Sequence, residues 1–197
     1  MQLLPLSRSI RACVAGVVFF ITSSAGAATI AEQNFSDRIR LGSSDLVLNG
    51  VGVRAVAWLK GYAAGLYLTQ KANTAAQVLA AKGPKRMQMK MLVDVEAKEF
   101  VKAFDKGMAR NHTPAEQEAL RERGQQFNRS VNALGALKPG DVIDLDFVPP
   151  RGFVLSVNGV ARGGAIPGED FYAGLLKIFI GERPVDTQLK AGLLGAP

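Results

Sequence analysis

One positive charge stands in an apolar stretch of the chain, and its chemistry is the first question that the sequence raises. Arg54 lies within residues 49–68, NGVGVRAVAWLKGYAAGLYL. Residues 53–59 are β-branched and aromatic, which predicts a strand. Side chains alternate along a strand, so Arg54 shares a face with Val56 and Trp58. Arginine stays protonated in proteins, and on a buried face it needs a partner, either an internal carboxylate or carbonyl or a bound anion.

The same stretch predicts a hairpin. Asn49-Gly50 and Gly52 are turn and loop signals before the first strand, and Lys60-Gly61 predicts the tight turn into a second strand, residues 62–68. Tyr62 opens the second strand. Tyr67, near its end, faces either the cleft of Arg54 or the opposite side of the sheet.

A helix over residues 96–111 is the second element with candidate chemistry. Phe100, Phe104 and Met108 recur at helical spacing and form its inward stripe. Asn111 follows seven residues after Phe104 and lies on the same face. A buried amide needs partners, so Asn111 is either a cap at the helix end or a contact to a ligand, and spacing alone favours the cap.

The other polar and sulfur-containing groups predict neither a metal site nor a cofactor. Met87, Met89 and Met91 alternate along a strand (residues 86–93), and such a row either binds copper(I) or fills a core; with no His or Cys nearby, the core is favoured. His112, the only histidine, is expected at the surface or as a helix cap.

No standard catalytic motif occurs in the sequence. Asp144 and Asp146 share one face of a strand, where paired carboxylates are expected to be solvated. The groups left for a site are Arg54, Tyr62 and Asn111 beside an apolar surface. They suit a polar or anionic head whose apolar body lies inside.

The first 27 residues have the form of a secretory signal peptide. Arg8 and Arg11 precede an apolar run, residues 12–21, and the small residues Ala25-Gly26-Ala27 suit a signal peptidase. The apolar run is short for a transmembrane helix, and an uncleaved anchor is the alternative. We therefore expect a periplasmic protein with one mature domain, residues 28–197. Cleavage removes Cys13, the only cysteine.

The charge of the chain gives little indication of a macromolecular partner. Of 24 basic residues, 22 remain after loss of Arg8 and Arg11, against 17 acidic ones, a net charge of +5. The basic residues are spread beside acids on helical patterns, which is typical of a solvated surface. We expect no nucleic acid partner and no stable membrane insertion after cleavage; attraction to anionic lipid is weakly supported.

The order of predicted elements indicates an α+β fold. Strands are expected at 38–41, 46–48, 53–59, 62–68 and 86–93, then at 142–148, 153–157 and 160–166; helices are expected at 74–81, 96–111, 113–134, 170–180 (capped by Asp170) and 186–193. Antiparallel hairpins without βαβ regularity predict one antiparallel sheet with helices on one face.

Three segments in the correct order resemble the chalcone isomerase-fold family. They are GVGVRAVAWLKGYAAGLYL, the helix with Phe104 and Asn111, and FYAGLLKIFIGERPVDTQLKAGLLG near the end. With the signal peptide, the chain resembles a bacterial exported branch of this family. The resemblance implies an open-faced β-sandwich, a large antiparallel sheet covered by a layer of helices.

The resemblance also implies site residues. Arg54 matches the arginine that steers the substrate in the plant isomerases, and Asn111 matches an asparagine that contacts the substrate's far ring. Phe104 replaces a tyrosine, Tyr62 aligns with one threonine and Ile178 replaces another. Much of the polar set that would stabilise an enolate is therefore gone. Other members of the fold bind fatty acids, with the arginine on the carboxylate.

Three functions follow from these residues. The favoured one is non-catalytic periplasmic binding of a fatty acid or other small amphiphilic acid, with Arg54, Tyr62, Phe104, Asn111 and Ile178 in the site. Val56, Trp58, Met89, Met91, Phe100, Met108 and Leu175 are expected to complete the slot for the tail. The second is an intramolecular lyase or isomerase using Arg54, Tyr62 and Asn111. The third is a structural or partner-binding envelope protein in which Arg54 pairs internally across a filled cleft.

Overall fold

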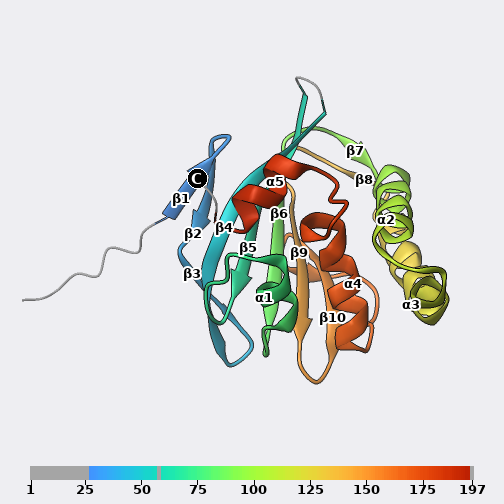
Figure 1. Ribbon diagram of the computed structural model, residues 1–197. Helices are drawn as coiled ribbons and strands as arrows, with labels where there is room; N and C mark the ends of the chain where they lie inside the picture. Colours follow the sequence, from blue (N-terminus) through green and yellow to red (C-terminus); the bar gives the residue numbers. More distant parts are fainter. Residues whose placement is uncertain (1–26, 57–58, 196–197) are drawn as a thin grey trace, which may run out of the picture.

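An antiparallel sheet organises the computed structural model, which describes residues 27–56 and 59–195 (Figure 1). Within these ranges seven strands form one sheet in the order β11-β10-β9-β6-β5-β4-β3, beside two separate two-stranded ladders, β1-β2 and β7-β8. The strands are β1 Ala27–Ile30, β2 Gln33–Ser36, β3 Arg38–Leu41, β4 Ser44–Val56, β5 Leu59–Leu68, β6 Lys85–Met91, β7 Val95–Glu96, β8 Ala136–Leu137, β9 Val142–Val148, β10 Gly152–Val157 and β11 Val160–Ala161.

The helices gather on one face of the large sheet. They are α1 Ala75–Ala80, α2 Ala97–Asn111, α3 Pro114–Asn132, α4 Glu169–Ile180 and α5 Thr187–Leu193. Each contributes to a core shared with the sheet, through Val78, Phe104, Phe127, Phe171 and Leu189 respectively. The predicted fold class, an α+β fold with a large antiparallel sheet covered by helices, is confirmed.

A second, smaller core lies on the opposite face. It contains Phe35, Leu41, Leu46 and Tyr67, and the β1-β2 hairpin packs against it through Ala28 and Ile30. The sequence did not predict this hairpin. The alternatives for Tyr67 are resolved here, because its ring belongs to this core rather than to the helix side.

Strand β4 differs from its prediction in length. Residues 44–56 form one strand, so the two short strands expected there are continuous, and Lys60 and Gly61 belong to β5 rather than to a turn. The glycines in β4 serve another purpose: a Cβ on Gly52 would lie 2.9 Å from the carbonyl oxygen of Leu189, so glycine lets α5 approach the strand. Trp58 lies outside the described residues.

Side-chain hydrogen bonds cap the start of three of the five described helices. Thr113 and Glu116 form a reciprocal capping box at α3, and the Thr74 hydroxyl caps α1. The prediction for α4 is wrong: Gly168 is the N-cap, and Asp170 instead accepts two hydrogen bonds from Arg123, at 2.6 and 2.7 Å. A carboxylate in the first turn bridges α4 to α3 rather than capping its own helix.

The prediction that Asp144 and Asp146 are solvated is wrong, whereas His112 takes the second of its two expected positions, that of a helix cap. Asp144 and Asp146 are buried on the face away from the helices, where Arg86 and Gln88 contact them. His112 follows α2 as its C-cap but is buried, with Nδ1 3.0 Å from the carbonyl oxygen of Met108. Arg86 and Gln88 hydrogen-bond the two carboxylates, whereas only Nδ1 of the His112 ring has a partner among the described residues, and Nε2 is buried without one.

Smaller differences concern strand ends. The last predicted strand, 160–166, is reduced to β11, with one isolated bridge between Phe153 and Ile166.

The methionine row is buried on β6, which confirms the core interpretation. No described helix is long and apolar enough to cross a membrane. No cluster of three or more His, Cys, Asp or Glu suited to a metal ion occurs in residues 27–56 and 59–195.

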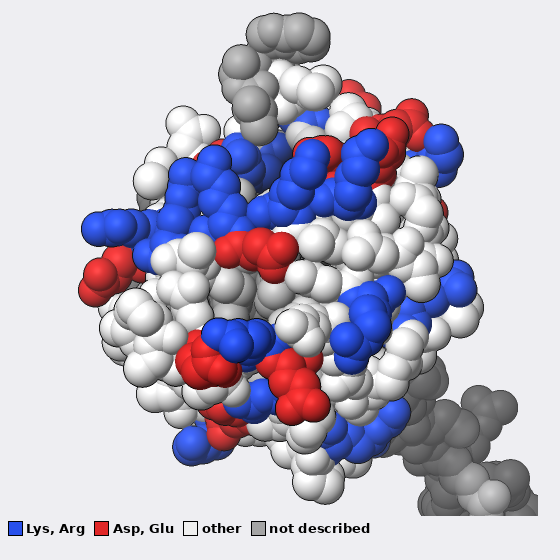
Figure 2. All heavy atoms as spheres, turned by 90° about the vertical axis from the view of Figure 1, so that its right-hand side faces the viewer, with Lys and Arg blue, Asp and Glu red and all other residues white. Residues whose placement is uncertain are grey.

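Helix α2 is amphipathic in the predicted sense. Phe104 and Met108 are buried, whereas Lys98, Lys102 and Lys106 are exposed on the outer side. Figure 2 shows the side of the molecule on which α2 and α3 lie, where basic side chains are interspersed with acidic ones. Lys102, for example, contacts Glu99 at 2.8 Å. The outer side of α2 is thus a solvated surface, and its inner side roofs the space described next.

Candidate functional site

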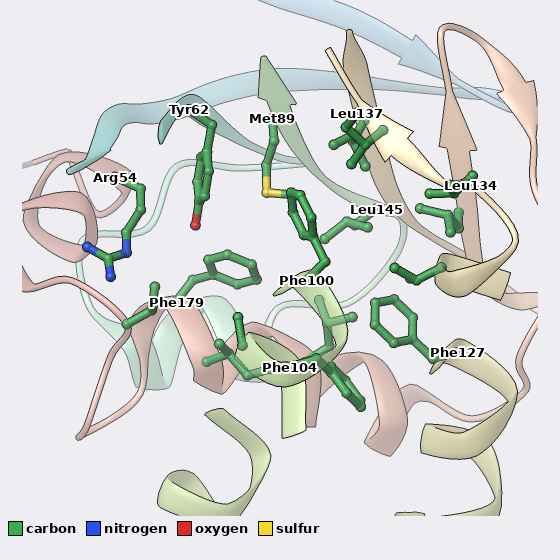
Figure 3. Close-up of a pocket in the computed structure, with 17 residues that line it drawn as sticks. Arg54, Tyr62, Met89, Phe100, Phe104, Phe127, Leu134, Leu137, Leu145 and Phe179 are labelled. Carbon is green, nitrogen blue, oxygen red and sulfur yellow. The ribbon is translucent and has the colours of Figure 1, made fainter. Parts of the chain in front are cut away.

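A cavity of about 150 Å³ lies between the sheet and the helix layer (Figure 3). Strands β4, β5, β6, β9 and β10 supply its floor, and α2, α3 and α4 supply most of its roof. Seventeen residues line it, and only Arg54 and Tyr62 bring side-chain nitrogen or oxygen atoms; the other fifteen are apolar. The cavity is therefore an apolar chamber with polar chemistry from two residues.

These two residues are neighbours because of strand register. Arg54 on β4 pairs directly with Tyr62 on β5, and the register shifts immediately afterwards, between Arg54 and Ala55. Directly opposed residues point to the same face of a sheet. In Figure 3 both side chains descend from adjacent strands at one end of the cavity. The β4-β5 hairpin thus places a guanidinium and a hydroxyl side by side at one end of the cavity.

The Tyr62 hydroxyl is free to contact a ligand. Burial raises the pKa of Tyr62 strongly, and the nearby positive charge of Arg54 only partly opposes this shift. The hydroxyl therefore stays protonated near neutral pH and acts as a hydrogen-bond donor, not as a base. It has no hydrogen-bond partner among the residues that the structure describes.

Arg54 has an internal partner that sequence reasoning did not name. Its Nη1 lies 3.3 Å from Oδ2 of Asp186 and also donates to the Ala55 carbonyl. Asp186 is simultaneously the N-cap of α5, because its Oδ1 accepts the Leu189 amide at 2.9 Å. The sequence signals were the helix expected to begin at residue 186 and the requirement that a buried arginine be paired.

The pairing uses only part of the guanidinium. Nη1 makes both contacts, whereas Nε and Nη2 have no acceptor within the described ranges. An arginine offers five N–H donors in a planar fork. Arg54 can therefore keep its contact to Asp186 and still donate to a second acceptor in the cavity.

Comparison with known proteins assigns the fold to a family. Residues 27–195 match the model of the chalcone isomerase-like family. The chain belongs to this family. No curated protein matches it.

A solved structure of the same fold is a fatty-acid binding protein from Arabidopsis thaliana. It aligns with a TM-score of 0.62 and 18% sequence identity, over 86% of this chain and 96% of that one. At this identity the similarity shows the fold alone. It places the described sheet and helices of this chalcone isomerase-like chain in the arrangement that the sequence had predicted.

Within the chalcone isomerase-like fold, four of the five predicted site residues meet in the cavity. Arg54, Tyr62, Phe104 and Ile178 all line it. Asn111 does not: its Nδ2 donates to the carbonyls of Gly107 and Arg183, both at 3.0 Å, and its Oδ1 accepts the Arg183 amide at 3.0 Å. The Asn111 amide therefore links the end of α2 to the segment after α4. Its NH2 group and its oxygen are both hydrogen-bonded to backbone groups.

The predicted slot for the tail is partly reproduced. Met89, Phe100 and Leu175 line the cavity, whereas Met91 and Met108 are buried outside it. The side chains of Val56 and Trp58 are not among those described. The residues that sequence reasoning missed come mainly from α3, the loop after it and β8–β10: Phe127, Val131, Leu134, Leu137, Ile143, Leu145 and Leu155, with Ala103, Phe179 and Val185. Phe127 and Val131 were recognisable as the inward stripe of their helix.

Proposed function

We propose that this protein binds a small amphiphilic acid without transforming it. The ligand's carboxylate would lie against Arg54 and Tyr62, and its apolar body would fill the cavity. The observation that carries the proposal is the placement of one guanidinium and one hydroxyl, which has no partner in residues 27–56 and 59–195, in an otherwise apolar chamber. Ligand sites of this type are mostly apolar, with a few polar groups that fix orientation.

The chemistry of the two polar residues suits a carboxylate. A hydrogen bond between a guanidinium and a carboxylate is charge-assisted and about twice as strong as a neutral one. The unused donors of Arg54 supply this contact, and the protonated Tyr62 hydroxyl adds a neutral donor beside it. The fatty-acid binding protein from Arabidopsis thaliana supports the proposal, because it binds such a ligand within the same fold.

Isomerase chemistry is the second candidate. Arg54 and Tyr62 would be its polarising groups, as an enone acceptor requires. Phe104, however, packs its ring against Phe127 with centroids 4.4 Å apart and contributes no donor where the resemblance expects a tyrosine. Asn111, the remaining member of the expected set, is held by backbone outside the cavity. Turnover of a chalcone above the spontaneous rate, abolished in Arg54→Ala, would establish this activity.

A structural role is the third candidate, and the contact between Arg54 and Asp186 favours it. A purely internal ion pair would leave the cavity without a function. The space beside the pair and the unused donors of Arg54 argue for a ligand instead.

The proposal includes export to the periplasm. The predicted signal peptide, residues 1–27, ends at Ala27, the residue at which β1 and the family match begin. N-terminal sequencing of the protein from a periplasmic fraction should find a start near residue 28. A cytoplasmic protein that retains Met1 would contradict export.

The binding proposal is tested by native mass spectrometry of the protein purified from its own compartment, with organic extraction of what co-purifies. We expect a stoichiometric acid on the wild type and none on Arg54→Ala. Arg123→Ala is the matched control, because it removes a partly buried arginine that contacts Asp170 outside the cavity. A wild-type protein that carries no acid and takes up none on addition would refute the proposal.

A further inference from the structure

The size of the cavity limits the ligand more sharply than its chemistry does. An apolar cavity of about 150 Å³ holds a single benzene ring, and sites for drug-sized ligands start at roughly 300 Å³. The cavity described here has about 150 Å³. A long-chain fatty acid could place only a fraction of its tail inside, so its fit requires that a wall move.

The end of the cavity furthest from Arg54 is closed by packed aromatic rings. In Figure 3, Arg54 and Tyr62 lie at one end of the labelled group and Phe127 at the other. The Phe127 ring is 4.4 Å from that of Phe104, 5.7 Å from Phe153 and 6.4 Å from Phe171, measured between centroids. Deepening the cavity here would separate rings that form the centre of the main core.

The roof is attached at three points along α2. At its start the Ala97 amide donates to the Gly135 carbonyl at 2.8 Å, next to the β7-β8 ladder. In its middle, a Cβ on Gly107 would lie 2.6 Å from Cγ2 of Ile178, so α2 approaches α4 as closely as glycine allows. At its end the Asn111 amide clasps Arg183. The roof cannot rise without breaking one of these attachments.

We infer that the ligand is a carboxylic acid with a short body, of about six to eight carbon atoms or one aromatic ring. This inference rests on the proposed function. The rings of Phe100, Phe104 and Phe127 and the Met89 thioether suit an aryl body as well as an alkyl one. Asn111 was considered as a ligand contact. In this inference it limits the size of the ligand instead, because its hydrogen bonds to Arg183 keep α2 close to the sheet.

The test is a length series of straight-chain acids, from butanoic to hexadecanoic, together with phenylpropanoic acid. Each is titrated calorimetrically, below its micellar concentration, into the purified protein stripped of lipid. We expect the affinity to peak at hexanoic to octanoic acid and at phenylpropanoic acid. Hexadecanoic acid should bind at least about tenfold more weakly than the best acid, because its extra methylenes fit only if the packed rings at the closed end or the roof attachments are disrupted.

A variant of the closed end sharpens the test. Phe127→Ala should move the optimum to chains longer by about three carbon atoms, because it extends the cavity at its far end. Leu120→Ala is the matched control: it truncates a buried side chain of the same helix that does not line the cavity, and it should leave the optimum unchanged.

The outcomes separate the two proposals. A wild-type protein that binds hexadecanoic acid best overturns the size limit and leaves acid binding intact. A protein that binds no acid of any length refutes both. The wild-type series decides the matter even where Phe127→Ala does not fold.

Discussion

Two half-buried arginines on opposite faces of the sheet show how differently one side chain can be used. Arg86, on β6, donates from Nε and Nη2 to both oxygens of Asp146, at 2.6 Å each, and its Nη1 lies 3.3 Å from Asp144. Arg54, on β4, meets one carboxylate oxygen of Asp186 at 3.3 Å through a single nitrogen. Their side chains are similarly exposed, 17% and 24%.

The two arginines differ in how many of their N–H donors remain without an acceptor. Burial acts to lower the pKa of Arg86, but the hydrogen bonds and charges of Asp146 and Asp144 outweigh it and leave the pKa raised. All three of its side-chain nitrogens contact a carboxylate. Arg54 keeps two nitrogens unused beside an apolar chamber. Arg86 is fully used within the protein, whereas Arg54 keeps N–H donors available for the ligand that we propose.

The largest effect should come from Arg86→Ala. Asp144 and Asp146 would be left buried without their cation, and breaking a buried ion pair in this way costs about 3–5 kcal/mol. Urea denaturation with linear extrapolation measures the loss of free energy of unfolding. A loss below about 1 kcal/mol would mean that Arg86 is no better satisfied than Arg54, and the contrast would fail.

Arg54→Met should cost far less stability, about 1 kcal/mol, because its one long contact to Asp186 is weak and methionine keeps the apolar stem. The same substitution should weaken acid binding about 10- to 100-fold, since charge-assisted hydrogen bonds are lost. Denaturation and calorimetric titration on one preparation measure both quantities. Equal costs at Arg54 and Arg86, with binding unchanged, would favour the structural role instead.

The sequence predicted the fold better than it predicted the hairpin that carries Arg54. Alternation and helical periodicity are local, so they identified β5, β6, β9 and β10 and all five described helices. Strand β4 was expected as two short strands because Gly50 and Gly52, which lie within it, were interpreted as turn signals. Their cause is tertiary: α5 packs onto β4 at these glycines. A pattern of glycines does not distinguish a turn from a close approach of two elements.

The residues around the cavity were also predicted in part, and contacts between distant segments account for what was missed. Arg54 and Tyr62 were found because a charge in an apolar strand is visible in one segment. Asp186 contacts Arg54 from 132 residues away, and nothing local to either residue reports that contact. For Asn111 the spacing favoured a cap at the helix end, and its Nδ2 does donate to the Gly107 carbonyl of the last turn; its other partners, the backbone groups of Arg183, lie 72 residues along the chain.

Replacing Asp186, the internal partner of Arg54, tests the comparison of the two arginines through the carboxylate. Asp186→Asn keeps a good cap for α5, so the free energy of unfolding should fall by less than about 1 kcal/mol. The negative charge that competes for Arg54 disappears, and affinity for an acid should rise about three- to tenfold. Affinity for the corresponding uncharged alcohol is the control and should change little. An acid affinity that falls would mean that Asp186 holds Arg54 in its binding position rather than competing for it.

The smallest effect concerns the tyrosines beside the two arginines. Burial raises the pKa of Tyr67 to about 12, opposed by Arg86, and raises the pKa values of Tyr62 and Tyr172 further. These are the only three tyrosines, so the folded protein should show almost no tyrosinate absorbance at about pH 10, where unfolded tyrosine is half ionised.

Because the pKa values are raised on folding, the tyrosines favour the folded state below about pH 10, and this contribution is lost as the pH rises towards 12. Spectrophotometric titration of Tyr67→Phe should lack the first step, near pH 12, that the wild type shows. A first step that persists in this variant would assign the earliest ionisation to Tyr62. That result would mean that water reaches the cavity end more readily than the opposite face, and that Arg54 lowers the pKa of its neighbour more than Arg86 does.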